Sequence, residues 1–364
     1  MHNLIANIAK FRQLLIEVYG TDNLINGNLR HYPNQPKATD IEIIALTLAA
    51  ESQGIISENY LFQILDSDYK SYRQTLPDRS NYNRRKRALQ PFIDELSRKV
   101  SDELNIGQEI YIIDSMPLPI ARYARKNKIK IMMEDLDFKP AVGYSAIDKT
   151  NYIGYKLNLT VSSNGVVNNL ALTQANVHDV KTLEMMTKGF INDVKLLGDK
   201  GYIAKNVQLS LFEEFKIKVI TPPRNNQMGP SPWTPRDRRI RKRIETTFSQ
   251  FCDQFRMKLN FAKSFHGFYT RIVAKIAAFT FLQYMNHLNN KPLNRTKNAL
   301  FLTAQRVYLP NWVGENDGFI PTKRRSKFQI YFLTILSFPK ILFLLYKMLF
   351  HENVDYLSSA QDHE

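Results

Sequence analysis

The chain has 364 residues, is 44% hydrophobic and carries a formal net charge of +16. This length and apolar content suffice for a sizeable core in two or three domains, and so basic a balance favours a polyanionic partner, either nucleic acid or an acidic membrane surface. A single cysteine, Cys252, excludes a disulfide framework and a cysteine-based zinc site. With no signal peptide at the N-terminus, we expect a cytoplasmic protein.

Residues 1–104 are predicted to form an all-helical domain. Apolar residues recur there every three or four positions, which is the spacing of one buried helix face. Gly20 ends the first such segment, and Thr39 is a candidate N-cap for the second. Helices are expected at 4–18, from Thr39 onward, at 57–65 and at 80–104, the last with an interruption near Pro91.

The last of these helices carries a basic run at 84–87. Clusters of Lys and Arg often form only a solvated surface. Two further clusters, at 122–130 and 236–243, make phosphate contacts the better interpretation in so basic a chain. We therefore predict that residues 1–104 bind DNA, although no helix-turn-helix signature identifies a recognition helix. The predicted DNA-contacting side chains of this domain are those of Arg84, Arg85 and Arg87.

Residues 105–295 are predicted to form a mixed α/β domain. Ser163-Asn164-Gly165 is a strong turn signal between two strands. The order is a meander of antiparallel strands followed by alternating helix and strand, which is that of a ribonuclease H-like fold. Strands are expected at 109–114, 141–147, 152–161, 166–173, 194–198 and 217–220, and helices at 180–190, 236–257 and 268–288.

Three acidic residues stand out in this domain. Asp114 and Asp199 each follow an apolar strand, and we expect the chain to leave the sheet there, where the active sites of open sheets usually lie. An Asp after a strand is also often only a turn residue. Glu245 is predicted to share a helix face with Phe248 and Cys252, where a buried carboxylate needs a partner. That partner could be a metal ion or, through an i, i+4 ion pair, Arg241.

These residues resemble the DDE triad of insertion-sequence transposases, and their contexts resemble the insertion-sequence-982 family. The contexts are YIIDSMPLP around Asp114, LLGDKGY around Asp199 and RRIRKRIETTFSQF around Glu245. The stretch from Thr173 to Asp179 also resembles the T-x-x-N-x-H-D motif of such enzymes. Many relatives carry a Tyr seven residues before the Glu and a Lys seven after it. Here Arg238 and Cys252 occupy those positions, so the roles of that Tyr and Lys do not carry over.

The resemblance implies that Asp114, Asp199 and Glu245 are both catalytic residues and ligands of two Mg²⁺ ions, or of Mn²⁺. Two such ions can drive attack of an oxygen nucleophile on a phosphodiester. Cleavage at the element's ends would then be followed by joining of the 3′-OH to target DNA. The remaining site residues implied are His178 and Asp179 as supporting residues, and Lys200, Arg238, Arg241 and Lys242 as DNA-binding residues.

The implied partners are the terminal inverted repeats and target DNA, bound by a homodimer or higher assembly associated with the nucleoid. No small-molecule substrate is expected. The absence of a Gly-rich phosphate loop argues against an ATP-driven motor, and the sequence also has no G-x-S-x-G motif. Two alternatives remain open. One is a metal-dependent nuclease that only hydrolyses DNA, and the other is an inactive remnant or DNA-binding regulator without strand-transfer activity.

The tail at 296–364 has no counterpart in this resemblance. Its apolar stretch from Phe328 to Phe350 is long enough for a membrane span, but Lys340 lies near its centre. A central Lys costs roughly 2.5–3.5 kcal/mol on insertion scales, so a packed or loosely attached helical hairpin is favoured over a membrane anchor.

We predict that deleting residues 300–364 leaves a folded catalytic domain, because the triad and its supporting segments all precede the tail. Circular dichroism and thermal unfolding of the truncated protein would check this. Loss of solubility or of cooperative unfolding would instead make the tail part of the core.

Overall fold

The computed structural model describes residues 3–134, 138–146, 148–190, 193–223 and 232–300. Contacts group the chain into one unit at Met1–Leu309 and a second at Pro310–Glu364. The second unit, including the apolar stretch considered as a membrane span, lies outside the described residues. Within the described part of the chain, no helix combines the length and the apolar character needed to cross a membrane.

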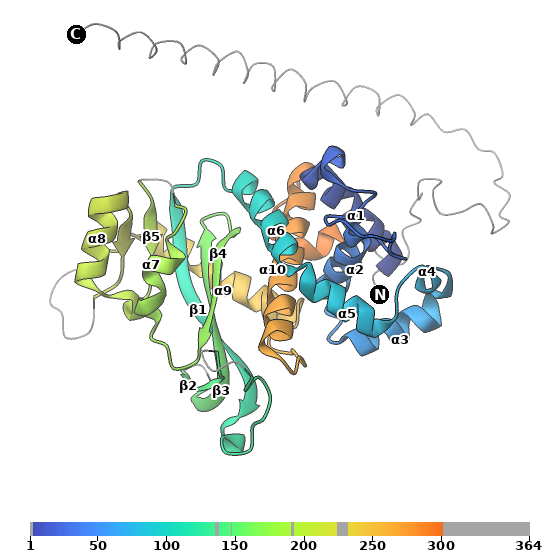
Figure 1. Ribbon diagram of the computed structural model, residues 1–364. Coiled ribbons are helices and arrows are strands. Elements are labelled where there is room, and N and C mark those ends of the chain that lie inside the picture. The colour runs from blue at the N-terminus through green and yellow to red at the C-terminus, as the bar shows by residue number, and fades with distance from the viewer. Residues whose placement is uncertain (1–2, 135–137, 147, 191–192, 224–231, 301–364) are drawn as a thin grey trace, which may run out of the picture. The chain divides into compact units, whose positions relative to one another are not determined.

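The helices expected in the N-terminal part are present (Figure 1). Thr39 forms a capping box with Glu42 at the start of the second helix, as its sequence position suggests. The predicted break near Pro91 is confirmed, and the proline lies in the first helical turn, where its missing N–H costs nothing. The elements are α1 (Leu4–Tyr19), η1 (Thr21–Asn23), α2 (Asp40–Ser52), α3 (Glu58–Asp68), α4 (Lys70–Gln74), α5 (Arg79–Ala88) and α6 (Gln90–Leu104).

A six-stranded mixed sheet follows, with the expected meander. Strand β1 pairs antiparallel with β3 on one side and parallel with β5 on the other, and β6 extends the parallel part. The second edge of β3 pairs with β2 and then with β4. This arrangement is compatible with a ribonuclease H-like core. The strands are β1 (Ile110–Arg122), β2 (Ala141–Ser145), β3 (Thr150–Ser162), β4 (Val167–Gln174), β5 (Lys195–Leu197) and β6 (Lys218–Ile220).

Two predictions about these elements are wrong. The chain does not leave the sheet after Asp114, because β1 continues to Arg122 and keeps its pairing with β3. Its β5 side is unpaired beyond Ile112 in the described sheet, and prolines such as Pro117 and Pro119 are tolerated on such an edge. The helix expected at 180–190 is reduced to η3 (Asp179–Thr182) and α7 (Leu183–Met186), followed by Gly189 with a positive φ.

Side chains of β1 alternate between two cores, one on each face of the sheet. Ile112 and Met116 belong to the large core shared with the N-terminal helices, whereas Tyr111 and Ile113 pack with Leu183 and other residues of the opposite face. Figure 1 shows α7 and α8 on one side of the strands and α6 and α10 on the other. The remaining elements are η2 (Tyr123–Arg125), η4 (Lys200–Tyr202), α8 (Lys205–Phe215), α9 (Pro235–Asp253), α10 (Phe265–Leu288) and η5 (Thr296–Ala299).

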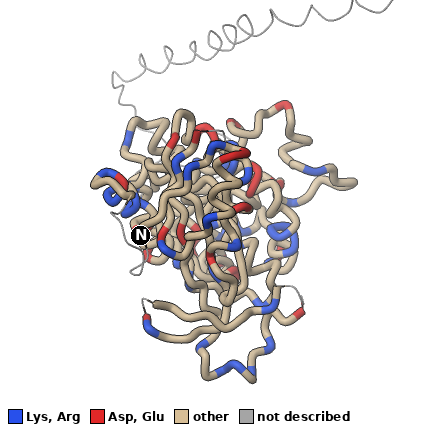
Figure 2. Tube along the Cα trace, turned by 90° about the vertical axis from the view of Figure 1, so that its left-hand side faces the viewer, with Lys and Arg blue, Asp and Glu red and all other residues tan. Residues whose placement is uncertain are grey.

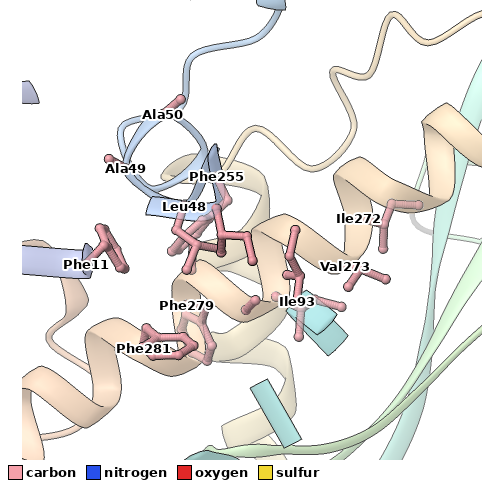
Figure 3. Packing of buried hydrophobic residues seen from close by; sticks show 14 of the residues in the cluster. Phe11, Leu48, Ala49, Ala50, Ile93, Phe255, Ile272, Val273, Phe279 and Phe281 are labelled. Carbon is pink, nitrogen blue, oxygen red and sulfur yellow. The ribbon is translucent and has the colours of Figure 1, made fainter. Parts of the chain in front are cut away.

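Helix α10, near the C-terminal end of the described residues, packs against the N-terminal helices. It packs against α2 and α6, and Figure 3 shows Phe279 and Phe281 of α10 close to Phe11 of α1 and Phe255. The rings of Phe255 and Phe279 meet edge to face with centroids 5.8 Å apart. The large core therefore depends on sequence segments about 250 residues apart.

Buried charges also connect α2 to α10. Glu51 is 3% exposed and accepts hydrogen bonds from Arg271 at 2.9 Å and from Lys275 at 2.6 Å. Arg271 also donates to the carbonyl oxygen of Ile55 at 3.0 Å. Burial alone would raise the pKa of Glu51, but the charges of Arg271 and Lys275 lower it to about 2. The carboxylate therefore stays ionised, and its two cations are neutralised inside the core.

Replacing Glu51 with Gln should lower the free energy of unfolding by roughly 3–5 kcal/mol near neutral pH, because Arg271 and Lys275 then remain buried without a counter-charge. Since the folded-state pKa is depressed, the contribution of Glu51 is present above its ordinary pKa of 4.5 and is lost as pH falls towards about 2. Denaturant unfolding would measure both effects.

The matched control is Glu95→Gln, which removes an exposed carboxylate paired with Lys99 on α6. We expect a loss of about 0.5 kcal/mol or less there. Equal losses from the two variants would contradict a structural role for the buried network.

Candidate active site

Asp114 and Asp199 lie at the same level of the sheet. The parallel register pairs Ile112 of β1 with Leu197 of β5, and each acid follows two residues later. The first acid remains within β1, opposite Leu159 of β3, whereas the second lies two residues after the end of β5 and caps η4. The two carboxylates are close enough for the charge of Asp199 to raise the pKa of Asp114. The strand register alone therefore brings them together.

Asp179 is a third acid at this position. Ser115 Oγ donates to Asp179 Oδ1 at 3.1 Å, and Lys156 Nζ donates to the same oxygen at 2.9 Å. A side chain at Gly201 would place its Cβ 2.9 Å from Asp199 Oδ1 and 3.5 Å from Asp179 Oδ2. Both carboxylates thus lie beside the backbone of Gly201, and a side chain at this position would press on the Asp199 carboxylate.

The cluster carries excess negative charge in a partly buried place. The pKa of Asp114 is raised to about 6: burial is the largest cause, and the charges of Asp199 and Asp179 add to it, whereas the Ser115 N–H and Arg241 lower it. Tyr202, directly after Gly201, is fully buried, and its pKa is raised by burial and by the three acids. Its hydroxyl has no hydrogen-bond partner among the described residues.

Arg241 connects Glu245 to the site, because it contacts both Glu245 and Asp114. On α9, Arg241 Nη1 donates to Glu245 Oε1 at 2.8 Å, and its Nη2 lies 3.6 Å from Asp114 Oδ2. The predicted i, i+4 ion pair is confirmed. The expectation that Glu245 is buried in an apolar row is wrong, because its side chain is 54% exposed and Ile244 takes the inward position. The guanidinium also lies over the ring of Trp233, 5.6 Å from its centroid.

A second ion pair fixes α9 against the sheet. Thr234 and Asp237 form a capping box at the start of the helix. Asp237 Oδ1 accepts a hydrogen bond from Lys195 Nζ of β5 at 2.6 Å, and the Asp237 residue is 1% exposed. Because Lys195 starts the strand that ends just before Asp199, one short strand positions both the second acid and the helix that carries Glu245.

The predicted DNA-binding residues fall into different environments. Arg84 and Arg87 are exposed on α5, whereas Arg85 turns inward and pairs with the buried Asp40 at 2.7 Å. On α9, Arg238 and Lys242 are exposed, and Lys200 lies in η4 beside the acids. Figure 2 shows Lys and Arg spread over several parts of the described chain, not gathered on one segment.

Three further residues of the site were missed by sequence reasoning. Ser115 and Lys156 hold Asp179, and Tyr202 lies under the acids. Lys156 had one usable signal, since it is the polar residue between the apolar Tyr155 and Leu157 of a buried strand. His178, predicted beside Asp179, has its side chain exposed to solvent.

The donors fit a divalent cation in their chemistry. They are carboxylate oxygens, which Mg²⁺ prefers, and the charges of the three acids act on the buried Tyr202 hydroxyl, which lacks a hydrogen-bond partner among the described residues. As they stand, no three Asp, Glu, His or Cys side chains in the described part of the chain are grouped closely enough to hold a metal. Glu245 is instead held by Arg241, which supplies positive charge at the same place.

Replacing Asp114 with Asn should stabilise the metal-free protein near pH 7 by about 1–3 kcal/mol, because an unfavourable ionised carboxylate is removed. The pKa of Asp114 rises from 3.8 to about 6 on folding. Its contribution to stability is therefore full below 3.8 and is lost as pH rises through about 6. The gain should shrink towards acidic pH.

Denaturant unfolding in a chelator, at acidic and neutral pH, would measure this gain. Asp22→Asn, at an exposed site in η1, is the control, with an expected change below about 0.5 kcal/mol. A destabilised Asp114→Asn protein at neutral pH would contradict the charge argument.

Comparison with known proteins places this site in a family context. Residues 105–281 match the family model described as a transposase DDE domain, which is just under half of the chain and includes Asp114, Asp199 and Glu245. No curated protein and no solved structure matches the chain. The matched segment supports the assignment of this protein as a transposase of the DDE type.

Proposed function

We propose that this protein is a DDE transposase that binds the terminal inverted repeats of an insertion sequence, cleaves the DNA ends and joins the 3′-OH to target DNA. The observation that carries the proposal is the shared level of Asp114 and Asp199, each two residues beyond the last pair of the parallel β1–β5 ladder, within the segment that matches the DDE domain. The ribonuclease H-like fold and the likeness to the insertion-sequence-982 family are part of the same proposal.

The proposed metal ligands are the three acids of the triad. Asp114 would be shared by two Mg²⁺ or Mn²⁺ ions, with Asp199 on one and Glu245 on the other. When bound, such ions activate a water for attack on the phosphodiester and stabilise charge on the leaving oxygen. Asp114 is suited to the shared position because it lies between Asp199 on β5 and Arg241 on α9.

The surrounding residues orient these acids. The Ser115 N–H donates to Asp114 Oδ1 at 2.8 Å, and the Gly201 N–H donates to Asp199 Oδ1 at 2.8 Å. Each bond engages one oxygen of the carboxylate, and the second oxygen of Asp114 lies 3.6 Å from Arg241 Nη2. Lys156 and Ser115 hold Asp179 beside them, where it adds negative charge that strengthens cation binding.

DNA binding is proposed for two surfaces. On α9, Arg238, Arg241 and Lys242 lie close to Glu245, so phosphate contacts there would place the backbone beside the acids. Lys200 lies next to Asp199 in η4 and would contribute to the same surface. On α5, the exposed Arg84 and Arg87 would serve recognition of the inverted repeats by the proposed helical domain at 1–104.

Arg85 is proposed to have a structural role in place of a DNA contact, because its ion pair with Asp40 orients α5 against α2. The catalytic domain is proposed at 105–295. Because transposition requires two ends together, the active form is proposed as a homodimer or higher assembly on DNA in the nucleoid.

The separate replacements Asp114→Asn, Asp199→Asn and Glu245→Gln should each reduce Mg²⁺-dependent cleavage of labelled element ends about a hundredfold or more, while end binding is kept. Cleavage gels and mobility shifts with the same duplexes would measure the two activities. Near-normal cleavage by any one variant would remove that residue from the triad.

Matched assays separate the alternatives. A hydrolytic nuclease would nick the ends but not join them to target DNA. An inactive remnant or regulator would bind the ends without Mg²⁺-dependent nicking by the unaltered protein.

A further inference from the structure

We propose that Arg241 is an exchangeable cation of this site: it bridges Asp114 and Glu245 in the absence of metal, and a divalent ion displaces it towards a DNA phosphate. The inference rests on the proposed function, in which these two acids share an ion. It adds a coupling between metal binding and DNA binding that the triad alone does not contain.

Charge and distance support the bridging role. The site gathers Asp114, Asp179 and Asp199, with Glu245 at its edge. Lys156 is already hydrogen-bonded to Asp179 on the other side of β1. Arg241 is the cation that the structure places against both Asp114 and Glu245. Its guanidinium therefore compensates the two carboxylates that a shared ion would otherwise hold.

The contacts of Arg241 with Asp114 and Glu245 are weak enough for a divalent ion to replace them. The separation of 3.6 Å between Arg241 Nη2 and Asp114 Oδ2 is too long for a hydrogen bond, so that contact is only electrostatic. The Glu245 side chain is 54% exposed and that of Arg241 is 26% exposed. Exposed ion pairs of this kind contribute little to stability. A divalent ion, with twice the charge and oxygen-seeking coordination, can replace a guanidinium held so weakly.

Once displaced, Arg241 has a place to bind. It lies on the same face of α9 as Arg238, three residues earlier, and Lys242 follows it; both of these neighbours are exposed. A planar guanidinium matches a phosphate with two parallel hydrogen bonds. In the metal-free position the guanidinium lies 5.6 Å from the centroid of the Trp233 ring, so displacement would separate these two groups.

Metal affinity is the first test. Mn²⁺ binding would be measured by electron paramagnetic resonance for the full chain and for Arg241→Gln, which keeps length and polarity but removes the charge. Loss of the competing cation should tighten Mn²⁺ binding roughly three- to tenfold. Arg239→Gln, an exposed cation two residues away on α9, is the matched control and should change it less than twofold. Unchanged or weaker binding by Arg241→Gln would overturn the exchange.

The fluorescence of Trp233 would measure the movement of Arg241, because the guanidinium lies over its ring. The chain has two tryptophans, and Trp312→Phe leaves Trp233 as the single fluorophore. In that background, Mg²⁺ should change the fluorescence saturably as the guanidinium leaves the ring, and the change should vanish in Arg241→Gln. A Mg²⁺ response that persists without Arg241, or no response in a protein that binds Mn²⁺, would contradict displacement.

DNA binding gives the opposite sign and separates exchange from simple damage. With Ca²⁺ in place of Mg²⁺ to limit cleavage, Arg241→Gln should bind a short DNA duplex several-fold more weakly than the unaltered protein. In a chelator the two should differ less than twofold, because Arg241 is then engaged with the acids. Reciprocity requires that the metal raise DNA affinity more in the unaltered protein. Equal DNA losses with and without metal would overturn the coupling.

The outcomes also distinguish this inference from the proposed function. If Mn²⁺ binds and Asp114→Asn abolishes that binding, but Arg241→Gln does not tighten it, the exchange fails and the two-metal site stands. If the unaltered protein binds no Mn²⁺ at this site, both proposals fail together.

Discussion

Like charges held together in a partly buried site need a cation, and much of this structure is arranged around that constraint. Asp114, Asp179 and Asp199 approach one another from three separate segments. Burial and mutual repulsion raise the pKa of Asp114 to about 6. Without bound cations, the site therefore lowers the free energy of unfolding. Catalytic sites often have such a cost. Arg241 and Lys156 offset part of that cost.

The scaffold that carries these acids is rigid where the chemistry requires it. Strand β1 is paired on both sides up to Ile112 and on one side through Asp114 and beyond. The ion pair between Lys195 and Asp237 ties α9 to β5. Glu245, by contrast, is exposed near the middle of α9, where it pairs with Arg241. Two acids are thus positioned by the sheet, and the third is positioned by a helix.

The large core links this scaffold to the N-terminal helices. Helix α10 lies at the C-terminal end of the segment that matches the DDE domain, yet it packs against α2 and α6 and shares buried charges with Glu51. The buried network around Glu51 specifies that pairing, because an alternative packing would leave three charges without partners.

The sequence by itself determined the local elements. Periodicity and caps located α1, α2 and α10, and the turn at Ser163 to Gly165 identified the hairpin between β3 and β4. The motifs around Asp114, Asp199 and Glu245 selected a segment that the family model also matches. Apolar spacing and turn chemistry are local properties, so they can be read without knowing the fold.

Only the tertiary structure decided what these side chains touch. The continuation of β1 past Asp114 depends on pairing with β3, whereas the apolar run before Asp114 led us to expect the chain to leave the sheet there. The inward turn of Arg85 depends on Asp40, which lies 45 residues earlier in the chain. The exposure of Glu245 follows from the rotation of α9 about its own axis where it packs against β1. A helical wheel does not determine that rotation. Long-range pairing sets strand length, ion partners and helix rotation, and none of these is encoded in neighbouring residues alone.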